Sequence, residues 1–189
     1  MGKNTISSIN NVFNSLKEKI VDKKFNAEIT EGKSIYDQPH KECNDEMPSI
    51  NDVMYFLKEI LVIKKAQYYG DKEEKDVENV IAKQLREEYG TTNVHTQYSV
   101  GGSLGLKCDI DLFNSKCCGI ELKLAKQIVG NSSAYERLIG QVVYYSKRCY
   151  KDRLIVLVVG TSKDYNTTLK EVQDFIEGLG VHFVFKEIL

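Results

Sequence analysis

Hydrophobic positions recur at helical spacing near the start of the chain, and the spacing predicts an amphipathic helix over residues 6–20. Its apolar residues are Ile6, Ile9, Phe13, Leu16 and Ile20. Residues 23–49 are polar and contain both prolines, so we expect a loop or linker there. The pattern therefore separates an N-terminal helix and polar linker, residues 1–50, from an α/β domain, residues 51–189.

Two further helical patterns precede the first predicted strand. The apolar stripe over residues 51–69 predicts a helix with Asn51 or Asp52 as its N-cap. A second helix is predicted over residues 73–89, because Gly90 follows its last apolar position and can end it.

The rest of the chain alternates predicted strands with predicted helices. Short apolar runs predict strands over residues 94–100, 106–113, 118–124, 153–160 and 181–185. Helical periodicity predicts helices over residues 133–150 and 164–179. The run in the fourth strand is apolar throughout, which is typical of a central strand buried on both faces. We therefore expect an α/β fold with a mixed central sheet flanked by helices.

Acidic residues interrupt the predicted hairpin formed by the second and third strands. Asp109 and Asp111 share one side of the first strand, while Glu121 and Lys123 share one side of the second. If residues 114–116 form a three-residue loop, Asp109 lies opposite Glu121. A two-residue loop would put the acids on opposite faces, and a longer offset would bring Asp111 opposite Glu121. We favour Asp109, with Asp111 as its competitor.

Two carboxylates that face each other across strands repel, and burial raises the pKa of at least one unless a cation lies between them. Mg²⁺ suits such a place, because it binds a few carboxylates and keeps positions for water and phosphate oxygens. The candidate ligands are Asp109, Glu121 and the carbonyl of Leu122, with Lys123 beside them to stabilise charge on a phosphate. The alternative is a surface hairpin whose charged residues lie on a solvated face.

These residues resemble the motif of the PD-(D/E)XK nuclease superfamily. The match is Asp109 on one strand and Ile120-Glu121-Leu122-Lys123 on the next, within an α-β-β-β-α-β order over roughly residues 73–160. Cys108 stands where the family name has proline. The resemblance implies a restriction-endonuclease-like fold, here with extra N-terminal helices. It also implies a Mg²⁺-dependent phosphodiesterase that hydrolyses DNA and leaves a 5′-phosphate, with Mn²⁺ able to replace Mg²⁺.

The resemblance also suggests residues on two helices. Members often carry a metal-binding Glu on the helix before the sheet, and Glu78 matches it, with Glu74 one turn earlier as the fallback. Many carry a Gln and then a Tyr on the helix after the Glu-x-Lys strand, which Gln141 and Tyr145 match. Gln141 would bind a phosphate oxygen or the attacking water. The alternatives are a solvated Glu78 paired with a neighbouring lysine, and a Gln141 that is merely polar beside a close helix contact.

Composition limits where a polyanion can bind. Hydrophobic residues make up 42% and charged residues 28% of the 189 residues, and the net charge is −1, so a site for DNA must be a local patch. The candidate contacts for DNA are Lys126, Arg137, Tyr145, Lys147, Arg148 and Lys151. A module with this fold that binds nucleic acid or a protein partner without cutting is the alternative function.

The remaining expectations concern surroundings and partners. The five cysteines are an odd number without paired spacing, which favours reduced thiols in the cytoplasm. No apolar run approaches the roughly 20 residues that span a bilayer, and we expect no membrane partner and no small-molecule cofactor. Many members of the superfamily act as dimers, so a homodimer is a further expectation. The apolar face of residues 6–20 would then meet a second copy or pack on its own domain.

Overall fold

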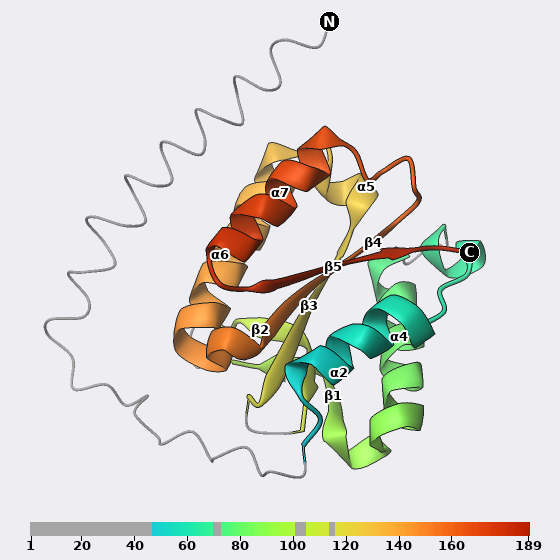
Figure 1. Cartoon of the computed structure of the whole chain (residues 1–189), viewed down its shortest axis with the longest axis vertical. Coiled ribbons are helices and arrows are strands. Elements are labelled where there is room, and N and C mark those ends of the chain that lie inside the picture. Colours follow the sequence, from blue (N-terminus) through green and yellow to red (C-terminus); the bar gives the residue numbers. More distant parts are fainter. Residues whose placement is uncertain (1–46, 70–72, 101–104, 114–115) are drawn as a thin grey trace, which may run out of the picture. The chain divides into compact units, whose positions relative to one another are not determined.

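A five-stranded sheet in the order β1-β2-β3-β4-β5 runs through the middle of the fold (Figure 1). The computed structural model describes residues 47–69, 73–100, 105–113 and 116–189. The predicted helix over residues 6–20 and nearly all of the predicted linker lie outside these ranges. The strands are β1 (Val94–Ser99), β2 (Lys107–Leu112), β3 (Cys118–Leu124), β4 (Leu154–Gly160) and β5 (His182–Glu187).

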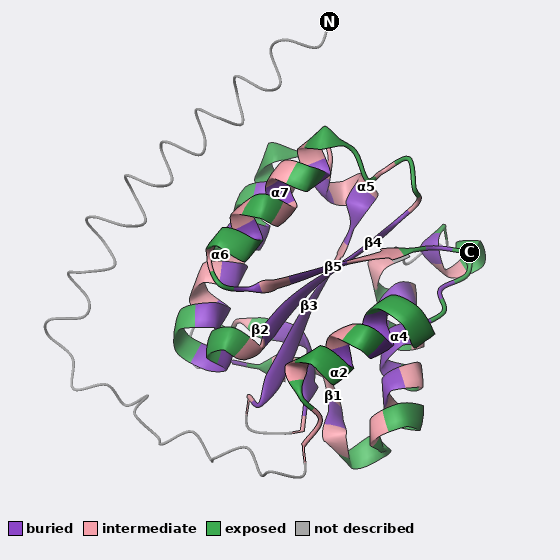
Figure 2. Ribbon diagram, in the orientation of Figure 1, coloured by how far each residue is buried: buried purple, intermediate pink, exposed green. Residues whose placement is uncertain are grey.

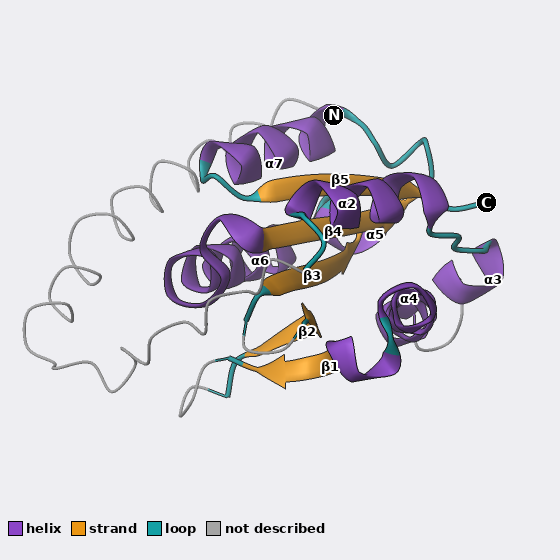
Figure 3. Cartoon of the chain, turned by 60° about the horizontal axis from the view of Figure 1, so that its bottom comes forward, coloured by secondary structure: helices purple, strands orange, loops and turns teal. Residues whose placement is uncertain are grey.

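The sheet is mixed, as predicted. Strands β1, β2 and β3 pair in antiparallel fashion, whereas β4 is parallel to β3 and β5 is parallel to β4. Parallel neighbours need a crossover connection, and helices between β3 and β4 and between β4 and β5 provide it. The β1–β2 hairpin lies at one edge of the sheet and β5 at the other (Figure 3).

The β2–β3 register is the one that a three-residue loop requires. Ile110 pairs with Ile120 and Leu112 with Cys118. Continued by one residue beyond Ile110, the same register sets Asp109 opposite Glu121. This register confirms the favoured prediction for the hairpin. A shift by one residue would have turned one set of acids to the other face of the sheet.

Helices cover both faces of the sheet. The longer ones are α4 (Glu73–Tyr89), α6 (Ser132–Tyr145) and α7 (Thr167–Gly178), and the short ones are α2 (Ile50–Tyr55), α3 (Lys65–Tyr68) and α5 (Ala125–Ile128). Helices α2 and α4 lie on one side and α6 and α7 on the other (Figure 1). Figure 2 shows the outward helix surfaces exposed, and strands β2, β3 and β4 are almost entirely buried, whereas the edge strands β1 and β5 are partly exposed. No described helix combines the length and the apolar character that a membrane span requires.

The main core lies between the sheet and the helices α2 and α4. Alternate positions of β2, β3 and β4 point into it, and the apolar stripes of the two helices pack against them. Its fully buried members include Val53, Leu57, Val77, Ile81, Leu85, Ile110, Ile120, Leu122, Leu157 and Val159. Burying one such side chain contributes about 1.5–3 kcal/mol. Because the inward positions are apolar, the charged positions of the hairpin face the opposite side of the sheet.

The prediction of one helix over residues 51–69 is wrong in its N-cap and in its length. Ser49 is the N-cap, since its hydroxyl accepts from the amide N–H of Asp52 while the carboxylate of Asp52 accepts from the N–H of Ser49. Helix α2 then continues as a π-helical turn, Phe56–Ile60, and stops. The predicted caps Asn51 and Asp52 are both already inside the helix.

An extended segment, residues 61–64, interrupts that predicted helix. Leu61 and Ile63 are buried while Val62 between them is exposed, which is the alternation of a strand. The side chain of Gln84 accepts from the N–H of Val62 at 2.9 Å and donates to its carbonyl at 2.7 Å. Leu189 donates its N–H to the carbonyl of Ile63. These long-range partners favour the extended conformation over a continuous helix.

The other predicted elements are found with small shifts. The bounds of α4 and β3 agree with the predictions, and Gly90 ends α4 at φ 87°. Helix α6 ends at Tyr145 and a π-helical turn, Ser146–Tyr150, follows it. Helix α7 begins three residues later than predicted, because Asn166 caps it by accepting from the N–H of Leu169. The short helix α5 was not predicted.

Candidate active site

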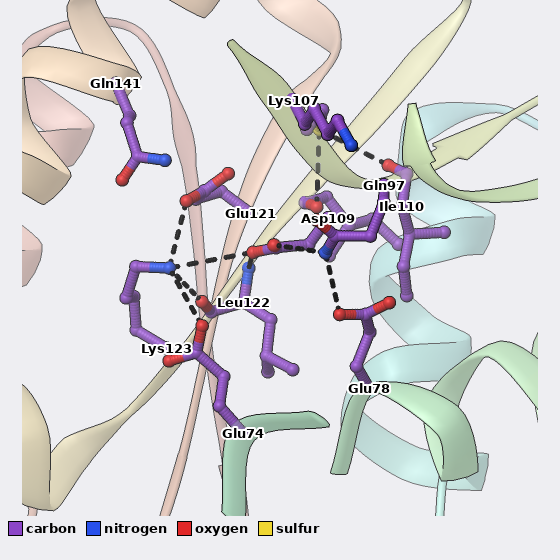
Figure 4. Close-up of polar contacts among 12 residues, drawn as sticks. Glu74, Glu78, Gln97, Lys107, Asp109, Ile110, Glu121, Leu122, Lys123 and Gln141 are labelled. Atoms are coloured by element: carbon purple, nitrogen blue, oxygen red, sulfur yellow. Dashed lines mark hydrogen bonds and ion pairs between the residues drawn. The ribbon is translucent and has the colours of Figure 1, made fainter. Parts of the chain in front are cut away.

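The ammonium of Lys123 lies among oxygen atoms that three elements contribute (Figure 4). Its Nζ is 2.6 Å from the carbonyl oxygen of Leu122 and 3.0 Å from Oε1 of Glu121, both on β3. It is 3.6 Å from Oδ2 of Asp109 on β2 and 3.5 Å from Oε1 of Glu74 on α4. The fold thus brings a helix and two neighbouring strands to one cation.

These acids are buried, which excludes the alternative of a solvated hairpin face. Glu121 is 0% exposed and Asp109 is 9% exposed. Oε2 of Glu121 has no hydrogen-bond partner among the described residues, and Oε1 has only its ion pair with Lys123. A buried carboxylate with an unsatisfied oxygen is costly, so the structure concentrates uncompensated negative charge at this point.

Burial and charge act on the pKa values at the site in opposite directions. Burial, reinforced by the neighbouring carboxylate of Asp109, raises the pKa of Glu121 to about 8. Burial by itself would lower the pKa of Lys123, but the carboxylates of Glu121, Asp109 and Glu74 outweigh it and raise that pKa above its usual value. Burial also raises the pKa of Glu74, against the attraction of Lys123. The lysine therefore stays charged, while Glu121 gains a proton easily.

The two competing aspartates have different partners. Oδ2 of Asp109 accepts from the backbone N–H of Leu122 at 2.8 Å, next to the ammonium of Lys123. Asp111 accepts instead from the hydroxyl of Tyr150 at 2.9 Å. Burial raises the pKa of Asp111 to about 6, with Tyr150 acting against it. Asp109 and not Asp111 is thus the aspartate at the lysine centre.

Helix α4 supplies two acids, Glu78 and Glu74. The sequence favoured Glu78 as the one at the site, but Glu74 is the one that contacts Lys123. Glu78 is 3% exposed, so it is not solvated as the alternative prediction had it. Its Oε1 does form the ion pair with a neighbouring lysine that this alternative expected, 2.6 Å from Nζ of Lys75. Oε2 of Glu78 accepts from Nε2 of Gln97 at 2.8 Å, and the same nitrogen donates to Oδ1 of Asp109 at 3.2 Å. Glu78 therefore reaches the strand acids through Gln97, while the fallback Glu74 contacts Lys123 directly.

Gln97 is the residue at this site that sequence reasoning missed. Thr96 pairs with Ile110 and Tyr98 with Cys108, so Gln97 lies opposite Asp109. Only the pairing register of β1 with β2 could have indicated that Gln97 lies near Asp109. The length of the connection between these strands does not fix that register.

A pocket of about 610 Å³ opens beside the carboxylates. Its lining includes Glu74, Gln97, Asp109 and Lys123, and on the other side Lys107, Gln127, Arg137, Gln141 and Tyr145. Strands β1, β2 and β3 and helices α4, α5 and α6 all contribute, so acidic and basic groups face the same space.

Gln141 and Tyr145 lie on one face of α6, as predicted. Nε2 of Gln141 is 3.5 Å from the hydroxyl of Tyr145, and Oε1 of Gln141 is buried without a hydrogen-bond partner in the described structure. Tyr145 is fully buried, and its hydroxyl donates to the carbonyl of Lys107 at 2.7 Å. The ring of Tyr145 therefore supports the pocket wall and is not exposed for stacking on a base.

The other predicted DNA contacts differ in exposure and in whether they line the pocket. Arg137 is exposed and lines the pocket. Lys126 is half-buried, donates to the carbonyl of Tyr68 at 3.2 Å and lies over its ring. Three further predicted contacts are exposed but lie outside the pocket lining: Lys147, Arg148 and Lys151. Lys107, which was not predicted, is exposed and lines the pocket.

The donor atoms at the lysine centre suit a hard divalent cation. Carboxylate and carbonyl oxygens are the ligands that Mg²⁺ and Mn²⁺ prefer, and here they already surround a positive charge. Within residues 47–69, 73–100, 105–113 and 116–189, no three His, Cys, Asp or Glu side chains are grouped closely enough to hold a metal ion. The ammonium of Lys123 explains the spacing, since it takes the central position itself. A Mg²⁺ ion at this place would require the side chain of Lys123 to move aside.

Comparison of the chain with protein-family models, with curated proteins and with solved structures finds no match.

Proposed function

We propose that this protein is a Mg²⁺-dependent deoxyribonuclease with a restriction-endonuclease-like fold, which hydrolyses phosphodiester bonds. The observation that carries the proposal is the convergence of Asp109, Glu121 and Glu74 on Lys123. Lys123, Asp109 and Glu74 line a pocket that Arg137 also lines, while Glu121 lies buried behind them. Buried acids of this number need a purpose, because an apolar hairpin would cost the fold less. Strongly shifted pKa values in a pocket are typical of catalytic sites.

The metal ligands in this proposal are Asp109, Glu121 and the carbonyl oxygen of Leu122, with Glu74 or Glu78 from α4 as a further ligand, directly or through water. When bound, the metal would lower the pKa of a water molecule and neutralise phosphate charge. Mn²⁺, which takes the same oxygen ligands, is expected to replace Mg²⁺.

The remaining groups act on the phosphodiester. Lys123, displaced from the centre but still beside it, stabilises the negative charge that develops on the phosphate oxygens. Gln141 has an unsatisfied amide oxygen in the pocket wall, which suits a hydrogen bond from the attacking water. In this proposal Arg137 and Lys107, which line the pocket, bind flanking phosphates.

A second function stays open, namely a module of this fold that binds nucleic acid or a protein partner without cutting it. The observation in its favour is that an ammonium and not a vacant space lies between the carboxylates. If Lys123 never leaves that position, its ammonium keeps a metal ion out and the pocket only binds.

The proposal is tested by cleavage of linear, supercoiled and single-stranded DNA, with RNA as a competing substrate, in Mg²⁺, in Mn²⁺ and in EDTA. We expect metal-dependent cleavage by the wild type, and a loss of about 100-fold or more in Glu121→Gln and Lys123→Met. The matched controls are Glu87→Gln and Lys83→Met, because these two residues form an exposed ion pair on α4. Both controls should cleave like the wild type.

Two results would count against the proposal. Metal-dependent cleavage retained in Glu121→Gln or Lys123→Met would contradict the assignment of the site. DNA binding by the wild type without cleavage under any metal condition would favour the second function.

A further inference from the structure

Gln97 has a backbone conformation that a strand residue rarely takes. Its φ is 54°, in the left-handed region, although it lies inside β1 and is not a glycine. Such conformations persist where the surrounding structure fixes them, and they are concentrated at functional sites. The neighbours Thr96 and Tyr98 keep the normal antiparallel register with β2, so the distortion is confined to one residue.

The amide nitrogen of this residue joins two acids from different elements. Nε2 carries two hydrogens, and they point to Oε2 of Glu78 at 2.8 Å and to Oδ1 of Asp109 at 3.2 Å (Figure 4). The other oxygen of Asp109, Oδ2, accepts from the N–H of Leu122 and faces Lys123. Each oxygen of Asp109 therefore has its own donor, and the plane of this carboxylate is fixed from both sides.

We infer that Gln97 is a positioning residue, which orients Asp109 toward the cation position and connects Glu78 to it. This inference rests on the proposed metal-dependent function. It adds that the geometry of the centre depends on an uncharged amide on β1, outside the strands that carry the motif. An amide is suited to this place, because it donates to both carboxylates without bringing a charge of its own.

The inference predicts a defect in metal binding without a defect in folding. Without the amide, Asp109 can rotate and Glu78 loses its link to the strand acids. Loss of a residue that orients a metal ligand usually lowers metal affinity or activity by about 10–100-fold. The effect should therefore appear in the dissociation constant for Mn²⁺ in the absence of DNA, and not only in cleavage.

The experiment is a calorimetric titration of the full chain with Mn²⁺, together with thermal unfolding in EDTA. The variants are Gln97→Gly, Gln97→Asn and Gln97→Ala. Glycine and asparagine tolerate a left-handed backbone, so they keep the conformation of the strand and remove or shorten the amide. Ser99→Ala is the matched control, since Ser99 is an exposed residue of the same strand.

We expect all three Gln97 variants to bind Mn²⁺ at least 10-fold more weakly than the wild type and Ser99→Ala. Gln97→Gly should still unfold cooperatively in EDTA as a folded protein, because glycine tolerates the left-handed backbone at this position. A Gln97→Gly variant with wild-type Mn²⁺ affinity would overturn the inference and leave the proposed function standing. A wild-type protein that binds no Mn²⁺ would overturn both.

Discussion

At the scale of single residues, the protonation of Glu121 is the property most sensitive to pH, because burial raises the pKa of this carboxyl to about 8. It is fully buried, and the groups that face it are Asp109 from β2, Lys123 from its own strand and Glu74 from α4. Burial and like charge disfavour its ionised form, and only Lys123 supports it. Its protonation state must therefore be linked to the stability of the metal-free protein.

The stability of the metal-free protein should fall as pH rises from about 4.5 to about 8. In this window folded Glu121, with a pKa of about 8, holds a proton that the unfolded chain has already released. The unfolded state thus binds fewer protons, and the free energy of unfolding decreases with pH until it levels off above the folded pKa. Urea denaturation at a series of pH values in EDTA measures this slope.

Glu121→Gln is the control for this prediction. It removes the titrating group and keeps the shape, so the decrease between pH 6 and 8 should become shallower. Asp111, with a pKa of about 6, contributes only to the lower part of the window. A Glu121→Gln profile parallel to that of the wild type would contradict the assignment of the raised pKa to this residue.

At the scale of elements, the π-helical turn after α6 contacts both strands of the β2–β3 hairpin. Tyr150 at the end of this turn lays its ring against Gly119 of β3 and donates its hydroxyl to Asp111 of β2. A Cβ atom built on Gly119 would lie 2.6 Å from the ring of Tyr150. This position therefore requires glycine because of close approach, not because of backbone conformation.

Gly119→Ala should destabilise the protein by about 1–3 kcal/mol, the usual cost of overpacking a core. The ring of Tyr150 is held by its hydrogen bond and is 2% exposed, so it cannot move without disturbing Asp111. Chemical denaturation of the two proteins measures the difference.

Gly140→Ala on α6 is the control for that substitution. A close helix contact next to Gln141 was the alternative prediction, but the neighbouring Gly140 is exposed and nothing lies within 4 Å of an added Cβ. Alanine there should stabilise the helix by about 0.5–1 kcal/mol. A Gly119→Ala protein as stable as the wild type would contradict the prediction and show that the ring of Tyr150 can move to make room.

At the scale of the whole molecule, attraction of DNA cannot come from net charge. The chain carries a formal charge of −1. Arg137 and Lys107 line the pocket with the acids, whereas Lys147, Arg148 and Lys151 lie outside that lining. Binding through the pocket should therefore involve few phosphates and depend only moderately on salt.

Arg137→Gln should weaken DNA binding and make the plot of log affinity against log salt concentration shallower by about 1. The physical reason is the loss of one phosphate contact and of the counterion released on forming it. Binding of a labelled duplex at several salt concentrations, in Ca²⁺ or in EDTA to prevent cleavage, gives the slope. Lys163→Gln, at an exposed position outside the pocket lining, is the control and should leave the slope unchanged. Equal slopes for the wild type and Arg137→Gln would exclude a phosphate contact at the pocket.

Local patterns were sufficient for most elements of this fold. The helix over residues 73–89 and the strand over residues 118–124 have strong periodicity and clear ends, and both were found as predicted. Prediction failed where distant partners decide the conformation. Gln84 and Leu189 hold residues 61–64 extended, and neither partner is visible in a window that contains only the segment itself.

The candidate site divides in the same way. Glu121 and Lys123 are two positions apart on one strand, and Asp109 lies opposite Glu121 on the neighbouring strand. The pairing rules of a hairpin with a three-residue loop therefore predicted that these side chains lie together. Gln97 and Glu74 come from other elements, and their approach depends on how β1 and α4 pack on the hairpin.

The sequence by itself determined the alternation of strands and helices and the mixed sheet, because these follow from local periodicity. It favoured the register that sets Asp109 opposite Glu121, and the structure selected that register among the loop lengths that were possible. The tertiary structure alone decided that Lys123 fills the space between the acids, that Asp111 turns to Tyr150, and that Gln97 links Asp109 with Glu78. The reason is physical: burial and contacts across elements set these side-chain positions, and no single stretch of chain contains that information.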